Sequence, residues 1–318
     1  RFEHIFSNVL GNELAAPLAV PGEPGAQFTR SYQRESLSLM AEQAYYLQKF
    51  SVSAGMLVHF NQSIPGGVSL YPGIDLGYQV NTHVRWYATG NRTLRLPTFT
   101  DLFYSGPTNI GNPDLKPEEA ISLETGLKGM VNRLHFELAV FRRWGRNMID
   151  WAKFPGDEKW RSLNLTEVNI SGVELGIELP FGRNTAVSNI AQRFRIDYTW
   201  LESDKKSDGF TSLYVLDNLR HKLDFSLNHR VTYHSGFELK ASWQDRAGGY
   251  LPFDNGAFVE EVSYKPVWLV SAKVFYNLKQ FQIYIDGSNV LNSEVFDHAN
   301  VPQPGRWIVA GVKYKLAF

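Results

Sequence analysis

Alternation of polar and apolar residues, repeated from one end of the chain to the other, is the feature that most limits what this sequence can fold into. In the last segment Ile308, Val312 and Leu316 share one side of an extended chain, while Lys313 and Lys315 share the other. Segments 193–200 and 237–244 repeat the pattern. A period of two residues is typical of β-strands and does not fit the 3.6-residue period of a helix. The chain is therefore predicted to be all-β.

The alternating segments number about fourteen, and their ends are defined to within a few residues. The expected strands are 1–10, 31–47, 49–60, 71–81, 83–95, 118–129, 134–150, 164–180, 193–203, 217–229, 234–246, 264–277, 280–290 and 306–318. Short turns are expected at 48–49, 81–83, 131–133, 231–233 and 278–279, with one longer connection, 181–192, in the same series. Between them lie long Gly-, Pro- and Asn-rich loops at 11–30, 61–70, 96–117, 151–163, 204–216, 247–263 and 291–305. Strands that run up and down, with every long loop at one end, are typical of a transmembrane β-barrel.

A half-buried sheet of a soluble protein also alternates, so the character of the two faces matters. The polar face carries both signs of charge in strand after strand, as the wall of a water-filled lumen would. Aromatic residues lie near strand ends, where the membrane interfaces belong, namely Tyr45, Phe50, Trp243, Trp268 and Tyr276. No run of about 20 apolar residues is present to form a transmembrane helix. The pattern favours a transmembrane antiparallel up-and-down β-barrel over a soluble β-propeller or sandwich.

Composition narrows the function classes. The 32 Lys and Arg residues balance the 32 Asp and Glu residues, which argues against a nucleic-acid partner. Cysteine is absent, which removes thiolate nucleophiles, disulfides and cysteine metal sites, and the eight histidines show no ligand-like spacing. An enzyme would have to use groups such as His221, Asp224 and Ser226, which share one strand in mixed orientations without a nucleophile elbow. Neither an enzyme nor a metal or cofactor is expected.

Both ends of the chain carry information. Arg1 is not followed by the apolar stretch of a signal peptide, so the sequence is expected to be a mature chain or to continue upstream. At the other end Val312, Tyr314, Leu316 and Phe318 occupy alternate positions. These residues resemble the terminal strand motif that outer-membrane barrels present to their assembly machinery. An ordinary edge strand that ends in Phe is the alternative.

Several motifs occur in a fixed order over essentially the whole chain. They are RLPTFTDLF at 95–103, GNPDLKPE at 111–118, SLETG at 122–126, MIDW at 148–151, NISGVE at 169–174, NVLN at 289–292 and PGR at 304–306. Together they resemble the barrel of TonB-dependent outer-membrane receptors. Within the motifs, Glu124 and Glu174 are expected to face the lumen, and Gly126 and Gly172 to mark bends or the close approach of another backbone. Structural support is expected of these four residues more than ligand contact.

The resemblance implies a barrel of about 22 strands, a plug domain inside it and a periplasmic segment that engages the TonB complex. Residues 1–318 are then the C-terminal portion of the barrel. The plug, the TonB-binding segment and about eight strands are expected in another segment or chain. An open sheet would leave edge N–H and C=O groups unpaired in the lipid bilayer, at several kcal/mol each. A closed fourteen-stranded barrel would instead indicate a passive channel.

The activity that the resemblance implies is energised uptake of a scarce, bulky nutrient across the outer membrane of a Gram-negative bacterium. The runs LPTFTDLFY, NMIDW and PQPGR look most like receptors for cobalamin or a related corrinoid, with ferric-siderophore receptors as the alternative. Loop residues expected to contact the ligand are Phe99, Asp101, Phe103, Tyr104, Trp151, Trp160, Tyr250, Phe253 and Tyr264. Each of them could instead pack within its loop or against a partner protein. A surface lipoprotein that docks on the same loops is a further partner to be tested.

Overall fold

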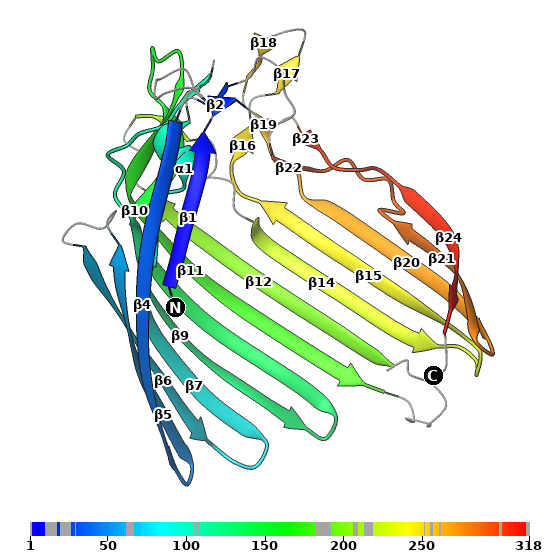
Figure 1. Cartoon of the computed structure of the whole chain (residues 1–318). Coiled ribbons are helices and arrows are strands. Elements are labelled where there is room, and N and C mark those ends of the chain that lie inside the picture. Colours follow the sequence, from blue (N-terminus) through cyan, green and yellow to red (C-terminus); the bar gives the residue numbers. More distant parts are fainter. Residues whose placement is uncertain are drawn as a thin grey trace.

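In a computed structural model the chain forms one large antiparallel sheet, which curves as part of a barrel wall (Figure 1). The structure describes residues 2–9, 18–19, 27–28, 30–61, 67–104, 106, 108–181, 192–205, 209–212, 219–250, 252–254, 257–260, 262–298 and 301–315. Over these residues, strands hydrogen-bond to one another in chain order. They are β1 (Phe2–Val9), β4 (Arg30–Leu47), β5 (Phe50–Asn61), β6 (Val68–Gln79), β7 (Val84–Arg95), β9 (Glu118–Val131), β10 (Leu134–Lys153), β11 (Trp160–Pro180), β12 (Arg193–Lys205), β14 (Leu219–Arg230), β15 (Ser235–Arg246), β20 (Val267–Leu278), β21 (Phe281–Ser288) and β24 (Trp307–Tyr314).

The remaining elements are short and belong to the long loops. Helix α1 (Phe99–Phe103) and β8 (Asn109–Ile110) lie between β7 and β9. β8 pairs with the start of β11, and β13 (Thr211–Ser212) pairs with the end of β10. The other short strands form pairs of their own: β2 (Leu18–Ala19) with β3 (Gln27–Phe28), β16 (Gly249–Tyr250) with β19 (Val262–Ser263), β17 (Phe253–Asp254) with β18 (Ala257–Phe258), and β22 (Phe296–His298) with β23 (Val301–Pro302). Within the described residues no helix is long and apolar enough to span a membrane.

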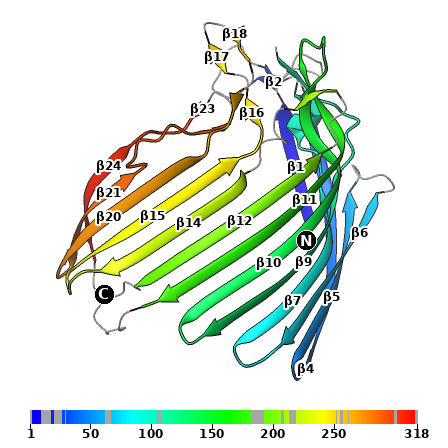
Figure 2. The ribbon, with the colours of Figure 1, turned by 180° about the vertical axis from the view of Figure 1, so that it is seen from behind.

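The predicted up-and-down order is confirmed. Every main strand pairs antiparallel with its neighbours in the chain, and short turns at one end alternate with long connections at the other (Figure 2). The predicted loop 151–163 was too long: it is mostly strand, because β10 runs to Lys153 and β11 begins at Trp160. This hairpin extends past the wall, where alternate side chains no longer face lipid and lumen, so its sequence lacks the pattern that marks the other strands.

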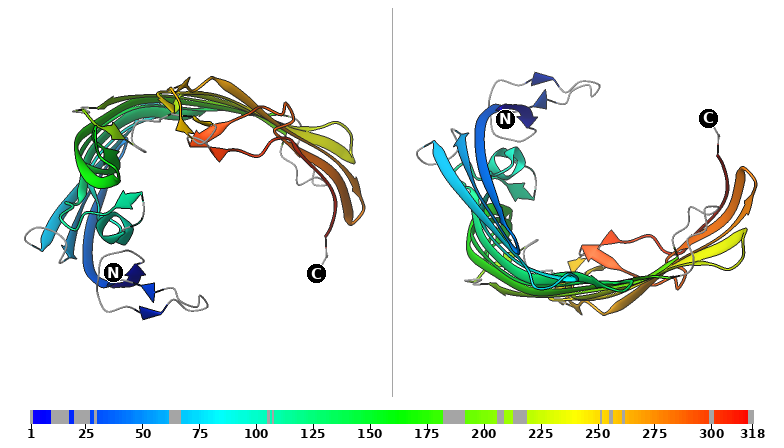
Figure 3. Two further views of the ribbon diagram at one scale, coloured as in Figure 1. Left: turned by 90° about the horizontal axis from the view of Figure 1, so that it is seen from above. Right: turned by 90° about the horizontal axis from the view of Figure 1, so that it is seen from below.

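The sheet has two open edges. Seen along its axis it forms an arc, and the two ends of the chain lie on either side of the opening (Figure 3). In the part of the chain that the structure describes, β1 pairs only with β4, and β24 pairs only with β21. A fourteen-stranded barrel closed on itself would require β1 to pair with β24, and the described residues do not show that pairing.

The concave face of the sheet is the polar one. Arg34, on the polar side of β4, lies over the ring of Phe99 in α1, with 4.8 Å from its guanidinium carbon to the ring centroid. Because α1 lies inside the arc (Figure 3), the polar side of β4 faces the concave lumen. The apolar side chains face outward: Ile308 and Val312 are 65% and 64% exposed, as expected of residues that contact lipid. Tyr314 shares that face, and Leu316 and Phe318 lie outside the described residues.

Aromatic side chains mark both borders of the outer face, as predicted. Near the short turns, the rings of Phe50 and Tyr78 lie 4.6 Å apart on neighbouring strands. At the long-loop end Trp243 stands opposite Trp268 in the register of β15 and β20. Aromatic rings favour the two interfaces of a membrane, so these residues delimit the part of the wall that crosses it.

The glycines that were predicted to mark bends or close approaches make room for aromatic rings. Gly172 stands opposite Phe141 in the register of β10 and β11, and a Cβ atom at Gly172 would overlap the Phe141 ring. Gly126 stands in the same relation to Tyr87 of β7, and there a Cβ would also meet the backbone oxygen of Leu138. The predicted close approach of another backbone is therefore confirmed at Gly126, whereas at Gly172 the approaching groups are side chains, those of Phe141 and Leu201.

Candidate functional site

Two clusters of side chains lie at the long-loop end of the sheet. The first is built on the segment between β7 and β9, which folds back against the concave side of the wall. Thr98 starts α1 through a capping box: its hydroxyl accepts the Asp101 amide at 3.1 Å, and its own amide donates to the Asp101 carboxylate at 3.0 Å. The Thr-x-x-Asp spacing favours a helix start at this place. The Asp101 carboxylate is thus engaged within its own turn.

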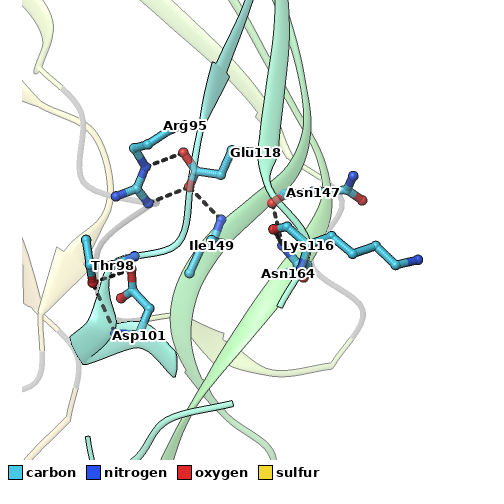
Figure 4. A network of polar contacts seen from close by, with 8 residues as sticks. All are labelled: Arg95, Thr98, Asp101, Lys116, Glu118, Asn147, Ile149 and Asn164. Carbon is cyan, nitrogen blue, oxygen red and sulfur yellow. Dashed lines mark hydrogen bonds and ion pairs between the residues drawn. The ribbon is translucent and has the colours of Figure 1, made fainter. Parts of the chain in front are cut away.

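A buried carboxylate fastens both ends of this segment to the wall (Figure 4). Glu118, at the start of β9, receives Nε and Nη2 of Arg95 at 2.5 and 2.6 Å. The same carboxylate accepts the backbone amide of Ile149, on β10, at 2.8 Å. The Glu118 side chain is 9% exposed and that of Arg95 is 52% exposed. A single side chain therefore ties together the end of β7, the start of β9 and the part of β10 near its C-terminal end.

An asparagine makes a second tie from β11 (Figure 4). The Asn164 side chain accepts the Lys116 amide at 2.8 Å and donates to the Lys116 carbonyl at 2.9 Å. Its amide group also donates to the Asn147 carbonyl at 2.7 Å. These contacts satisfy backbone groups that an irregular segment cannot pair by itself.

Apolar packing completes the first cluster. Leu102 and Leu115 are buried together with Ile149 of β10, and Phe99 and Phe103 pack against them. Farther out, the rings of Tyr104 and Trp151 meet edge to face with centroids 6.4 Å apart, and Trp151 is 8% exposed. The Trp160 amide donates to the Thr108 carbonyl at 2.8 Å. Six predicted ligand residues therefore lie in or beside this cluster, where each has a contact within the chain: Phe99, Asp101, Phe103, Tyr104, Trp151 and Trp160.

The second cluster is an aromatic pocket above β14, β15 and β20. The ring centroid of Tyr250 lies 5.2 Å from that of Tyr264 and 5.4 Å from that of Phe296. The three rings line a cavity of about 240 Å³, to which Gln244, Arg246, Lys265 and Glu294 also contribute. Gln244 and Arg246 belong to the face of β15 that carries Glu238 and Lys240, which is the lumenal face. The cavity therefore opens toward the lumen at the long-loop end.

The chemistry of the aromatic pocket suits a flat organic ligand with polar substituents. The guanidinium of Arg246 lies 5.6 Å from the Tyr264 ring centroid, which keeps a cation beside an aromatic surface. Lys265 supplies a further positive charge and Glu294 a negative one. A few polar groups around a largely apolar cavity are typical of sites that orient a small molecule.

The structure brings only part of the predicted ligand set together. Tyr250 and Tyr264 share the aromatic pocket, whereas the side chain of Phe253 lies outside the described residues. Sequence reasoning missed Phe296 and Arg246. The alternation of β15 already places Arg246 on the lumenal face, but no periodic signal marks Phe296, which comes from the connection between β21 and β24.

The residues considered for an enzyme do not converge. His221 faces outward and shares a hydrogen bond of 2.8 Å with the Tyr198 hydroxyl. Asp224 lies on the lumenal face of the same strand and pairs with Lys222 at 3.0 Å. The two groups are therefore on opposite sides of the sheet.

Comparison with known proteins places the chain among outer-membrane receptors. The family model described as TonB dependent receptor-like, beta-barrel matches residues 6–290. Vitamin B12 transporter BtuB of Vibrio vulnificus is 27% identical over 184 residues, which are 58% of this chain and 28% of that protein. The BtuB of Photobacterium profundum is 30% identical over 103 residues, 31% of this chain and 16% of that protein.

Among solved structures, a mutant of the ferric enterobactin receptor PfeA of Pseudomonas aeruginosa superposes with a TM-score of 0.70 and 16% identity, covering 98% of this chain and 49% of that one. At that identity the likeness shows the fold alone. The chain spans less than a third of the length of the two BtuB relatives and about half of the PfeA chain.

Proposed function

This chain belongs to the TonB dependent receptor-like β-barrel family of the Gram-negative outer membrane, and we propose that it is the C-terminal part of a receptor that takes up cobalamin or a related corrinoid. The observation that carries the ligand assignment is the aromatic pocket of Tyr250, Tyr264 and Phe296, which opens toward the lumen. A corrinoid offers a large flat ring with amide substituents. Such a ring can lie on aromatic faces and hydrogen-bond to Gln244 and Glu294 at the pocket wall.

A ferric siderophore is the second candidate, and a specific feature favours it. Arg246 and Lys265 place two cations at the aromatic pocket against the single carboxylate of Glu294, and cations beside aromatic rings suit an anionic aromatic ligand. The comparisons divide in the same way, since the two sequence relatives carry the name vitamin B12 transporter and the superposed structure is a ferric enterobactin receptor.

The proposed receptor includes further strands and a plug. The open edges at β1 and β24 would leave N–H and C=O groups in hydrocarbon, where each unpaired group costs several kcal/mol. Additional strands, contributed by another segment or chain, pair with these edges in the complete receptor. A plug inside the barrel closes the lumen, and the TonB complex, bound to a periplasmic segment, supplies the energy for uptake.

The experiment measures equilibrium binding of cobalamin and of a ferric siderophore to the intact receptor in detergent. We expect cobalamin to bind, and Tyr250→Ala and Tyr264→Ala each to weaken binding by about tenfold, because each removes one aromatic face. Tyr233→Ala is the matched control, since Tyr233 is 57% exposed at a short turn on the opposite end of the wall. Binding of the siderophore alone would move the assignment to the second candidate. Unchanged affinity in both pocket variants would remove the pocket from the ligand site.

A passive channel is tested separately. The intact receptor, reconstituted in a planar bilayer, is expected to conduct almost no current, because the plug fills the lumen. A large and steady conductance would contradict the plugged receptor and support an open pore.

A surface lipoprotein on the long loops is proposed as a further partner. Purification of the intact receptor from its membrane should then retain a lipoprotein in stoichiometric amount. Recovery of the receptor without one, under mild detergent, would count against this partner and leave the ligand assignment unaffected.

A further inference from the structure

The outward-facing residues of the wall change from apolar to polar toward the long-loop end. On β10 the outward residues run from Leu138 and Val140 to Arg142, Trp144 and Arg146 toward the long-loop end. The register places Val140 opposite Val173 of β11, and Trp144 opposite Asn169. Because long loops are the extracellular ones in such barrels, this polar belt lies at the level of the lipid headgroups in the outer leaflet.

A pocket occupies the belt on the outside of the barrel. It has a volume of about 400 Å³ and spans β7, β9, β10 and β11. Its lining includes Arg92, Ile121, Trp144, Arg146, Glu167 and Asn169. It is separate from the aromatic pocket, which lies on the lumenal face of the sheet.

Two arginines of β10 lie on either side of Trp144: Arg146 lines the outer pocket, and Arg142 lies next to it. Arg142 and Arg146 are both exposed and flank Trp144 at alternate positions of one strand. The Arg142 guanidinium lies 5.4 Å from the Trp144 ring centroid, which holds it on the outer surface. Arg92 forms an ion pair with Glu119, with 2.8 Å between Nη2 and Oε2. The carboxylate therefore balances the charge of Arg92. Arg146 therefore has its donors in the pocket wall, and Arg142 has its donors beside the pocket, next to the lining residue Trp144.

From this arrangement we propose that the outer pocket binds the phosphorylated sugar headgroup of an outer-leaflet glycolipid. A guanidinium group can donate two parallel hydrogen bonds to two oxygens of a phosphate. In this proposal Arg142 and Arg146 contact the phosphate. The Trp144 ring offers a flat apolar face to a sugar. Asn169 and the carboxylate of Glu167 bind sugar hydroxyls.

Two features favour a glycolipid over a free anion. The carboxylates of Glu119 and Glu167 stand on either side of Arg146 in the register, where they can accept hydrogen bonds from the several hydroxyl groups of a sugar. Below the pocket, Leu123 and Val140 are 51% and 50% exposed on the same face. They supply the surface that acyl chains attached to the headgroup would cover.

The experiment follows binding of lipid A to the intact, delipidated receptor by native mass spectrometry in detergent. Arg142→Ala is expected to weaken binding by about tenfold, and Trp144→Ala to weaken it as well. Arg143→Ala is the matched control, because Arg143 is the adjacent arginine on the lumenal face, where it bonds to Ser122 at 3.2 Å. Arg142→Gln, which keeps part of the side-chain stem, replaces Arg142→Ala if that variant does not show the heat-dependent gel migration of a folded barrel.

Further arms use dephosphorylated lipid A and inorganic phosphate as probes. The dephosphorylated lipid is expected to bind more weakly than lipid A to the unmodified receptor, and this difference in affinity is expected to be smaller in the Arg142 variant, which keeps Arg146. Equal affinity of the two lipids for the unmodified receptor would overturn the proposal, as would equal losses in the Arg142 and Arg143 variants. Displacement of lipid A by inorganic phosphate at millimolar concentration would also overturn it, because the site would then bind a free anion.

Discussion

Tyr87 on β7 donates a hydrogen bond from its hydroxyl to Oε1 of Glu124 on β9, over 2.9 Å. The register puts Gly126, not Glu124, opposite Tyr87. The ring therefore lies slantwise across the lumenal face and uses the space that a side chain at Gly126 would occupy. One aromatic ring thus links a glycine and a glutamate of the same motif, SLETG, to the preceding strand.

Gly126→Ala is expected to destabilise the barrel by about 1–3 kcal/mol, as overpacking in a filled site does. The added Cβ would stand 2.7 Å from the Tyr87 ring and 2.5 Å from the backbone oxygen of Leu138. Gly73→Ala is the control, because its Cβ would meet nothing closer than Asn91 at 3.9 Å. Urea unfolding of the refolded receptor measures both. Equal stability of the two variants would contradict the close packing at Gly126.

Glu118→Ala is expected to loosen the segment between β7 and β9, at a cost of about 1–3 kcal/mol. The substitution leaves the Arg95 guanidinium and the Ile149 amide without their acceptor. Glu119→Ala, at the next residue, removes an ion pair whose side chains are 37% and 33% exposed and should cost less than about 1 kcal/mol. Hydrogen exchange of the amides in 99–115 distinguishes the two. Faster exchange in the Glu119 variant than in the Glu118 variant would reverse the assignment.

Asn164→Asp is expected to weaken the hydrogen bonds by which Asn164 of β11 holds the backbone at Lys116 and Asn147. The new carboxylate oxygen replaces an amide that donates to the carbonyls of Lys116 and Asn147, so like partial charges then face one another. We expect a loss of about 1–3 kcal/mol, seen as faster amide exchange in 112–117. Asn91→Asp, at an exposed position of β7, is the control. Unchanged exchange in the Asn164 variant would show that its hydrogen bonds do not hold the segment.

Leu239→Lys is expected to impair assembly of the barrel, because Leu239 faces lipid and is 38% exposed. A lysine on the lipid face costs about 2–4 kcal/mol near the middle of the bilayer. Ser242→Lys places the same charge on the lumenal face of the same strand, opposite Asp224, and should be tolerated. Heat-dependent gel migration after refolding into vesicles reports the folded fraction. If the two lysines have equal effects, the assignment of lipid and lumenal faces fails.

The strands could be predicted from the sequence because lipid and water on opposite faces impose a strict alternation. The predicted segment 234–246, for example, is β15 to within one residue. The alternation ends where the wall leaves the membrane. For that reason the outer parts of β10 and β11 were predicted as loop. The pairing of β8 with β11 was not predicted, because no feature of the composition indicates it.

The candidate site could be predicted only in part. Tyr250 and Tyr264 belong to one long loop, so their shared role could be inferred from aromatic residues in a segment of that kind. Their contact with Phe296 depends on how two loops meet in space, which periodicity does not record. Similarly, Asp101 and Phe99 are of residue types that are common in binding sites. However, the Asp101 side chain forms the capping box with Thr98, and the Phe99 side chain packs against the core that contains Leu102.

The β10–β11 hairpin stays paired from Arg146 opposite Glu167 as far as Ala152 opposite Arg161. At about 3.3 Å per residue, it therefore projects roughly 20 Å beyond the polar edge of the wall. An antibody or a bacteriophage that approaches the cell meets its tip, residues 154–159, before it meets the membrane. Those tip residues are therefore the first that such an agent contacts, while Glu118 and Asn164 lie at the base of the hairpin.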